Sequence, residues 1–232
     1  MATDVKQQVT QPVTTPAPTR RNNSIEDFWI RYGKYIAYGI AIVLLLIAGY
    51  FAYQNYVVAP KEQKAVEAMW KAEDYYRIDS TRLALNGDGL NQGFLRIITR
   101  YDGTQSANLA KYYAGICYLK QGDFNNAIKY LKDFSTDDKL VQVRASGSLG
   151  DAYAESGKKG EAAEQYKKAG TLYEDDNFNS PEYLFRAGLM YQDLGKNKEA
   201  IEMFTIIKQK YLSSEKGRDI DKYLGRLGEV RD

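Results

Sequence analysis

The longest apolar segment of the chain lies near its N-terminus. Between Lys34 and Lys61 there are 26 residues without a charged side chain, and the centre of this run, IAYGIAIVLLLIAGYFAY, is continuously apolar. About 20 helical residues, each rising about 1.5 Å, cross the hydrocarbon core of a bilayer. Tyrosine and phenylalanine gather at both ends of the run, as expected at the two membrane interfaces. The pattern predicts a transmembrane helix that contacts the membrane through residues 36–58.

Two other structures could explain this run. A helix buried inside a soluble protein would need a larger core than the rest of the sequence offers. A cleaved signal peptide has an apolar region of only about 7 to 15 residues after a short leader, whereas 34 residues precede the run here. Basic residues are balanced across the span, but a short flank obeys the positive-inside rule better than a long domain. We therefore expect a cytoplasmic N-terminus and a C-terminal domain on the other side.

Three segments further along share one spacing of small and large residues: AGICYLKQGDFNNAIKYL, LGDAYAESGKKGEAAEQY and AGLMYQDLGKNKEAIEMF. Counted from the first glycine, a tyrosine follows at +3, a glycine at +7, an alanine at +12 and a large residue at +16. The residues that define the repeat are Gly115, Tyr118, Ala127, Gly150, Tyr153, Ala162, Gly188, Tyr191, Ala200 and Phe204. The first glycines recur after 35 and then 38 residues, which resembles the 34-residue tetratricopeptide repeat (TPR).

The residue types at these positions have a steric explanation. The first glycine lets two helices approach closely, and the alanine at +12 lets the second helix cross the first. The glycine at +7 ends the first helix, because a left-handed backbone costs glycine little. Ser180 and Pro181 are expected to form the N-cap and first residue of the third unit. The fold class is therefore all-α: an N-terminal transmembrane helix followed by a TPR-type helical-hairpin solenoid.

These patterns divide the chain into four parts. Residues 1–24, rich in Thr, Gln, Val and Pro, are predicted to be a disordered tail. Residues 25–59 form the juxtamembrane and transmembrane helix. Residues 60–105 form a linker helix and degenerate TPR-like helices. Residues 106–232 hold three TPR units and a C-terminal capping helix, so that about nine helices are expected after the span.

Composition removes several classes of function. The chain has no histidine and a single cysteine, Cys117, so the usual general base, a disulfide within the chain and a cysteine-zinc site are absent. A reducing compartment and an oxidising one that holds a buried thiol both remain compatible. The 32 basic and 30 acidic residues give a net charge of +2, which does not suit a nucleic-acid partner. We expect no enzyme activity, no catalytic residues, no cofactor and no metal.

A TPR solenoid presents a concave groove, lined mainly by the first helix of each unit. The resemblance implies that the groove carries the following residues: Leu109, Tyr112, Ile116, Leu119, Arg144, Asp151, Glu155, Phe185, Leu189 and Gln192. Apolar side chains with scattered charges suit a polypeptide partner. Taken singly, Tyr112, Ile116 and Phe185 are also explained as core residues packed against the next helix. The Lys and Asn positions that capture a chaperone's C-terminal carboxylate in some TPR proteins are not matched.

The whole arrangement resembles the bacterial ancillary Sec-translocon subunit family. The stretches that carry the resemblance are FLRIITRYDGTQSANLAKYYAGICYLKQGDFNNAIKYL and the anchor before it, while the long Thr/Pro/Gln tail departs from a minimal anchor. The resemblance implies a single-pass protein of the cell inner membrane with a periplasmic TPR domain. It implies as partners the Sec translocon, a membrane-anchored prolyl-isomerase-like chaperone and secreted clients. A TPR scaffold of another envelope machine, for cell division or secretion, is the alternative.

Overall fold

The structure is a computed structural model that describes residues 24–228, with side chains from residue 28 onward. The tail predicted at 1–24 therefore lies outside the described residues, apart from Ser24. Within the described range, every regular element is a helix, and the chain divides into a unit that ends at Ala52 and a unit that begins at Tyr53. The all-α prediction is confirmed.

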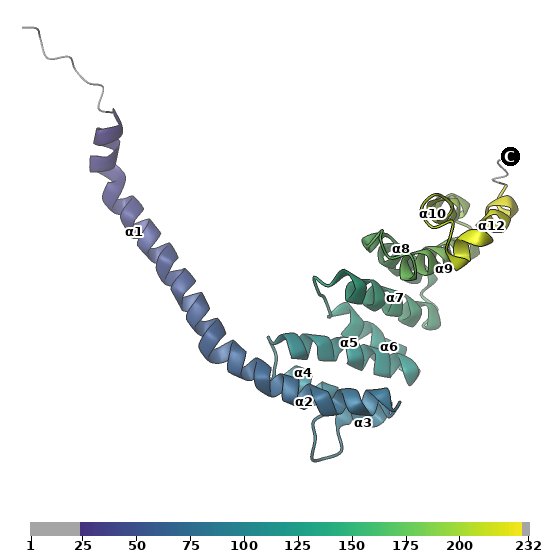
Figure 1. The fold of residues 1–232 in the computed structure, drawn as a ribbon, viewed down its shortest axis with the longest axis horizontal. Coiled ribbons are helices and arrows are strands. Elements are labelled where there is room, and N and C mark those ends of the chain that lie inside the picture. Colours follow the sequence, from purple (N-terminus) through teal and green to yellow (C-terminus); the bar gives the residue numbers. More distant parts are fainter. Residues whose placement is uncertain (1–23, 229–232) are drawn as a thin grey trace, which may run out of the picture. The chain divides into compact units, whose positions relative to one another are not determined.

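The first unit is a single helix, α1 (Ser24–Tyr53) (Figure 1). From residue 28 to Ala52 none of its side chains is buried; Leu45 is 72% exposed and Leu46 69%. By length and composition, this helix is apolar enough to cross a membrane. An exposed surface of leucine and isoleucine along a whole helix is what lipid, rather than water, would solvate.

Between α1 and the next helix the chain makes a wider turn, the π-helix η1 (Gln54–Val58). The amide of Ala59 donates to the carbonyl of Gln54, five residues back instead of four. Pro60 follows directly; it has no amide hydrogen and its ring would collide with a carbonyl one α-helical turn earlier. The wider turn gives the proline ring room without ending the helix.

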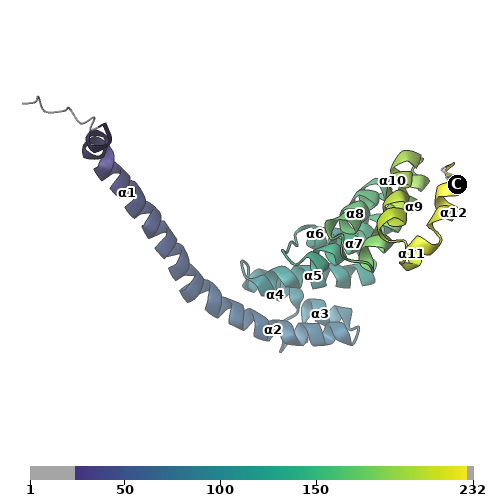
Figure 2. The ribbon, with the colours of Figure 1, turned by 45° about the horizontal axis from the view of Figure 1, so that its top comes forward.

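The second unit is a stack of helices in chain order (Figures 1 and 2). They are α2 (Ala59–Arg77), α3 (Thr81–Asn86), α4 (Phe94–Arg100), α5 (Gln105–Lys120), α6 (Phe124–Lys132), α7 (Lys139–Glu155), α8 (Lys159–Leu172), α9 (Asn179–Asp193), α10 (Asn197–Lys210), α11 (Glu215–Arg218) and α12 (Ile220–Arg226). Three hairpins, α5–α6, α7–α8 and α9–α10, form its main part. We call α5, α7 and α9 the A helices and their hairpin partners the B helices.

The three hairpins turn in the same way. Gly122, Gly157 and Gly195 have φ of 78°, 78° and 72°, in the left-handed region that favours glycine. In each turn the residue after the glycine donates its amide to the carbonyl of the tyrosine at +3, as Asp123 does to Tyr118 at 3.0 Å. The A helix thus ends in a Schellman motif, which satisfies its last carbonyls.

Close helix contact within each hairpin depends on the first glycine. A Cβ on Gly150 would lie 2.6 Å from Cδ1 of Tyr166, and one on Gly115 would lie 2.5 Å from Cγ of Leu131. The residue at +16 therefore packs directly on the glycine of its own unit. Ala127, Ala162 and Ala200, at +12, are fully buried.

Helix α2 is tied to the first hairpin by its own N-terminal residues. The Glu62 carboxylate accepts from the amides of Gln105 and Ser106, at 2.6 and 3.0 Å, and from the Ser106 hydroxyl at 2.5 Å. Lys61 Nζ donates to the carbonyl of Asp102 at 2.6 Å. Glu62 thereby satisfies free amides at the start of α5, which a helix usually satisfies with its own capping side chain.

Three details differ from the sequence expectation. Eleven α-helices, not about nine, follow α1 in the described part of the chain, because α3 was not anticipated and the C-terminal helix breaks at Asp219. The sequence GLNQGFLRIITRY predicts a degenerate second helix from Gly89, but helix α4 begins at Phe94, because the preceding segment is a loop with an isolated bridge between Gly87 and Gln92. Ser180 is not an N-cap: α9 begins at Asn179, and the Ser180 hydroxyl donates to the carbonyl of Tyr173.

Candidate binding groove

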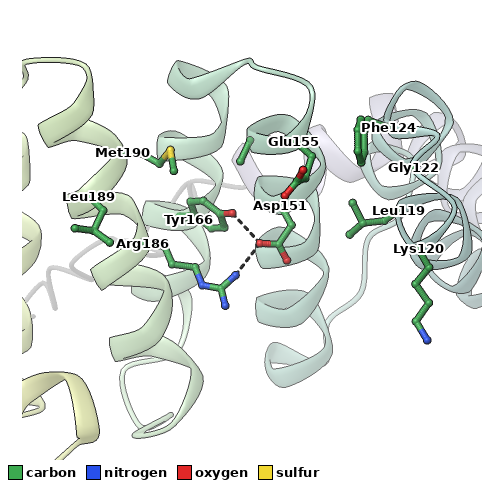
Figure 3. A pocket seen from close by; sticks show the side chains of 11 residues that line it. Leu119, Lys120, Gly122, Phe124, Asp151, Glu155, Tyr166, Arg186, Leu189 and Met190 are labelled. Atoms are coloured by element: carbon green, nitrogen blue, oxygen red, sulfur yellow. Dashed lines mark hydrogen bonds and ion pairs between the residues drawn. The ribbon is translucent and has the colours of Figure 1, made fainter.

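A cavity of about 650 Å³ opens across the three A helices near their C-terminal ends. We call it the central groove (Figure 3). Its lining residues are Leu119, Lys120, Gly122, Phe124, Asp151, Ala154, Glu155, Tyr166, Arg186, Leu189 and Met190. Each hairpin contributes to the lining, so the groove exists only because successive repeats stack side by side.

The middle of the central groove is organised around Asp151. One carboxylate oxygen, Oδ1, accepts from the Tyr166 hydroxyl at 2.7 Å and from Nη1 of Arg186 at 2.8 Å. The three residues come from α7, α8 and α9, so this cluster joins the second hairpin to the third. Figure 3 shows the tyrosine and the arginine converging on the same oxygen, while the second oxygen points away from them. Burial, followed by the charge of Asp151, raises the pKa of Tyr166 above its usual range.

Arg186 is held from its other side as well. Its Nε donates to Oε1 of Glu182 at 2.7 Å, and Lys216 lies 3.2 Å from Oε2 of the same carboxylate. Burial opposes ionisation of Glu182, but the hydrogen bonds from Arg186 and Lys216 outweigh it, and its pKa is lowered. The guanidinium also lies 5.9 Å from the ring centroids of Tyr166 and Tyr183. These contacts fix the arginine in one position.

A glycine in α7 makes room for one of these rings. Gly147 lies directly beneath the Tyr183 ring, so that a Cβ at this position would overlap its Cζ and Cε1 atoms. Tyr183 stacks on Tyr166 with ring centroids 6.2 Å apart. Burial, and after it the charge of Asp151, raises the pKa of Tyr183 to about 12. Gly147 thus allows close contact between two repeats, whereas Gly150 allows close contact between the two helices of one repeat.

The structure brings together four of the ten predicted groove residues, Leu119, Asp151, Glu155 and Leu189, which line the central groove. Leu109 lines a different cavity of about 650 Å³, bordered by α2, α5 and the turn before α7. Tyr112 and Ile116 are half-buried against a core cluster that contains Leu131 and Leu149.

The other three predicted residues lie elsewhere. Phe185 packs on Phe204 and Tyr223, with ring centroids 5.9 and 4.8 Å apart, so it has the alternative role of a core residue. Arg144 is exposed and Gln192 is half-buried, and neither lines the central groove or the cavity beside α2. Their part in binding stays a prediction.

Sequence reasoning missed Tyr166, Arg186, Phe124 and Met190. In the sequence pattern Tyr166 is only the large residue at +16 of the second unit, although its hydroxyl reaches the groove and donates to Asp151. Arg186 is two residues before the repeat glycine Gly188, a position outside the family's groove pattern. A signal was available: Arg186 follows Asp151 by 35 residues, close to the 38 residues that separate Gly150 from Gly188, so the two residues lie on neighbouring A helices.

The tyrosines at +3 have different environments. Tyr118 stacks on Tyr130 with centroids 5.5 Å apart. Tyr191 is buried and donates to Oε1 of Glu164, on the B helix of the preceding unit, at 2.8 Å. Tyr153 is half-buried beside Lys158. The same sequence position therefore supports contacts both within and between hairpins.

The described residues contain no group of three or more Cys, Asp or Glu side chains placed to hold a metal ion. Cys117 is fully buried in α5, and burial raises the pKa of its thiol to about 12. A buried, protonated thiol of this kind contributes to core packing and does not act as a nucleophile.

Comparison with known protein families identifies repeat models along most of the chain. A tetratricopeptide repeat-like domain matches residues 26–145, which is more than half of the 232 residues. Two further tetratricopeptide repeat models match residues 143–176 and 182–211. These two ranges contain most of the α7–α8 and α9–α10 hairpins. No curated protein matches the chain.

Proposed function

The chain belongs to the tetratricopeptide repeat-like family, and we propose that it is a membrane-anchored, non-enzymatic scaffold that binds proteins through the central groove. TPR domains are typically interaction scaffolds, and stacked repeats give them an extended concave surface. The observation that carries the proposal is that three consecutive A helices line one groove with apolar walls and fixed charges. Such a surface recognises side chains of a partner rather than a small molecule.

Membrane anchoring is supported by α1 and by the extent of the family match. The tetratricopeptide repeat-like domain begins at residue 26 and ends at 145, so the apolar helix and the first hairpin belong to one family domain. Because one family domain includes both the apolar helix and the first repeat, the helix fits the role of a membrane anchor for the scaffold. The positive-inside rule favours a cytoplasmic N-terminus and a periplasmic repeat domain, with the protein as a single-pass component of the inner membrane.

At this location the partners we propose are proteins of export. The scaffold would work beside the Sec translocon and help to pass secreted or outer-membrane polypeptides to a membrane-anchored prolyl-isomerase-like chaperone. The support is the resemblance in domain order and in the stretch that runs from α4 to α6. A scaffold for another envelope machine, in cell division or secretion, would use the same anchor and groove. The two proposals differ in the partner proteins that they predict.

Crosslinking in cells tests the proposal. A photoreactive amino acid replaces Leu189, in the central groove, or Glu161, an exposed residue of α8 that lines none of the described cavities. We expect protein adducts at Leu189, including translocon or chaperone components, and few at Glu161. Adducts with cell-division proteins would favour the alternative scaffold. Equal labelling at both positions would contradict binding through the groove.

Orientation is tested in the same cells. Protease added to intact spheroplasts should remove the repeat domain and leave α1 with the membrane. If the domain is digested only after the cells are lysed, the orientation is the reverse of the one proposed.

A further inference from the structure

Two acidic residues face the central groove from the same side of α7. Asp151 and Glu155 are four residues apart and therefore lie one above the other on one helix face. Apolar walls stand on both sides of them: Leu119 and Phe124 from the first hairpin, and Leu189 and Met190 from α9 (Figure 3). The groove thus has an acidic centre between two apolar sides.

The basic residues at this groove are already engaged. Lys120 donates to Oδ1 of Asp79 at 2.7 Å and lies 5.0 Å from the Tyr76 ring centroid, so its charge is turned away from the groove. Arg186 is held by Asp151 and Glu182 at 2.8 and 2.7 Å. Neither cation is free to neutralise further acidic groups in the groove.

Negative charge therefore remains without a partner in the groove. The side chain of Glu155 is exposed and makes no ion pair or hydrogen bond with any residue between 28 and 228. Within the same range, Asp151 has partners for Oδ1 but none for Oδ2. Arg144 of α7, which makes no ion pair with any residue between 28 and 228, is two helical turns from Asp151, at about 1.5 Å per residue, and does not line this groove.

We propose that the central groove binds a polypeptide segment in which a lysine or arginine is flanked by large apolar residues. The cation lies on Oδ2 of Asp151 and on Glu155, and the apolar neighbours lie against the two walls. Side chains on one face of an extended chain recur about every 7 Å, and packed helices are about 8–10 Å apart. Alternate residues of one segment can therefore contact all three A helices. This inference rests on the proposed function and gives it a partner chemistry.

The binding test uses the full chain in an uncharged detergent and three fluorescent peptides of eleven residues. Serine and leucine alternate in the peptides, beginning with serine, and lysine, glutamine or glutamate replaces the central leucine, so that the variable residue lies on the same face as the leucines. Binding is followed by fluorescence anisotropy at low and high salt. We expect the lysine peptide to bind roughly 3- to 10-fold more tightly than the glutamine peptide, with the glutamate peptide weakest. Salt should reduce the differences between peptides.

Variants at one residue test whether the groove is the source of this preference. Glu155→Gln should reduce the preference for lysine, and Glu155→Lys should reverse it in favour of the glutamate peptide. Both variants should fold, because Glu155 is exposed and supports no contact. Glu161→Gln is the matched control, since it removes the same charge from an exposed position outside the groove.

Three results would overturn the inference: equal binding of the three peptides, no binding of any peptide, or equal loss of the lysine preference in Glu155→Gln and Glu161→Gln. The proposed function is judged separately, by the adducts at Leu189. If these adducts form while the peptides show no charge preference, the scaffold stands and the partner chemistry proposed here is wrong.

Discussion

Replacing Gly188 by alanine should destabilise the third hairpin, although alanine is the better helix former. The added Cβ would overlap the ring of Phe204, lying 2.7 Å from Cζ and 2.8 Å from Cδ1. Phe204 is fully buried, and its ring packs against those of Phe185 and Tyr223, with centroids 5.9 and 5.7 Å away. The ring therefore has no open space into which it can turn.

The magnitude follows from two opposing terms. Forcing an extra methyl group into a packed core costs about 1–3 kcal/mol, while replacing a glycine inside a helix by alanine gains about 0.5–1 kcal/mol. The net loss for Gly188→Ala is about 1–2 kcal/mol, which lowers the melting temperature by about 2–8 °C for a chain of this size. Gly160→Ala, in α8, meets no atom within 4 Å. It should keep the whole helix gain and melt at the same or a higher temperature.

Thermal melting of the full chain in detergent, followed by circular dichroism, measures both effects. A double variant tests the mechanism: in a Phe204→Leu background the ring is gone, so Gly188→Ala should cost much less than it does alone. If Gly188→Ala melts like the unchanged protein, or lowers the melting temperature equally in both backgrounds, the close contact between Gly188 and Phe204 does not explain the requirement for glycine at this position.

Two further predictions concern pH and the first hairpin. The pKa of Tyr183 is raised to about 12, so its stabilising contribution is present below pH 10, where the unfolded tyrosine is also neutral, and is lost as pH rises towards 12. In the variant Tyr183→Phe the melting temperature should therefore fall less steeply with pH in this window. An unchanged slope would contradict this expectation. Glu62→Ala leaves the Gln105 and Ser106 amides unpaired, which costs about 1–2 kcal/mol and should accelerate the hydrogen exchange of these two amides. Glu67→Ala, on the same helix, should leave their exchange unchanged. Equal exchange in both variants would show that the contact of Glu62 with α5 does not stabilise the first hairpin.

The hairpins could be predicted because their steric needs are local and repeated. At Gly150 and Gly188 a large side chain of the same hairpin occupies the space of a Cβ, so any other residue destabilises the hairpin. At Gly122 and its equivalents the backbone itself requires glycine. Each requirement restricts one position of every unit to glycine. Because the unit occurs three times, the pattern is visible in the sequence.

The charges of the groove could not be predicted in the same way. The charge of Lys120 is taken up by Asp79, 41 residues earlier, and that of Arg186 by Asp151, 35 residues earlier. Sequence alone shows that these residues are charged but not which of them remain free. Ser180 fails for a related reason: the longer loop before α9 places Asp176 where its carboxylate accepts from the amide of Asn179, at 2.8 Å, and the serine turns inward.

The polar contacts between repeats join residues about one repeat apart. Arg186 and Asp151 are 35 positions apart, Lys167 and Glu202 also 35, and the Lys159–Asp193 pair 34. Short separations keep the entropy of loop closure small and favour fast folding. A chain delivered end-first through a narrow pore could therefore form each hairpin as it emerges and dock it on the one before. Helix α12, which covers the α9–α10 hairpin with Ile220 and Leu224, would then close after that hairpin, and folding would advance at the pace of delivery.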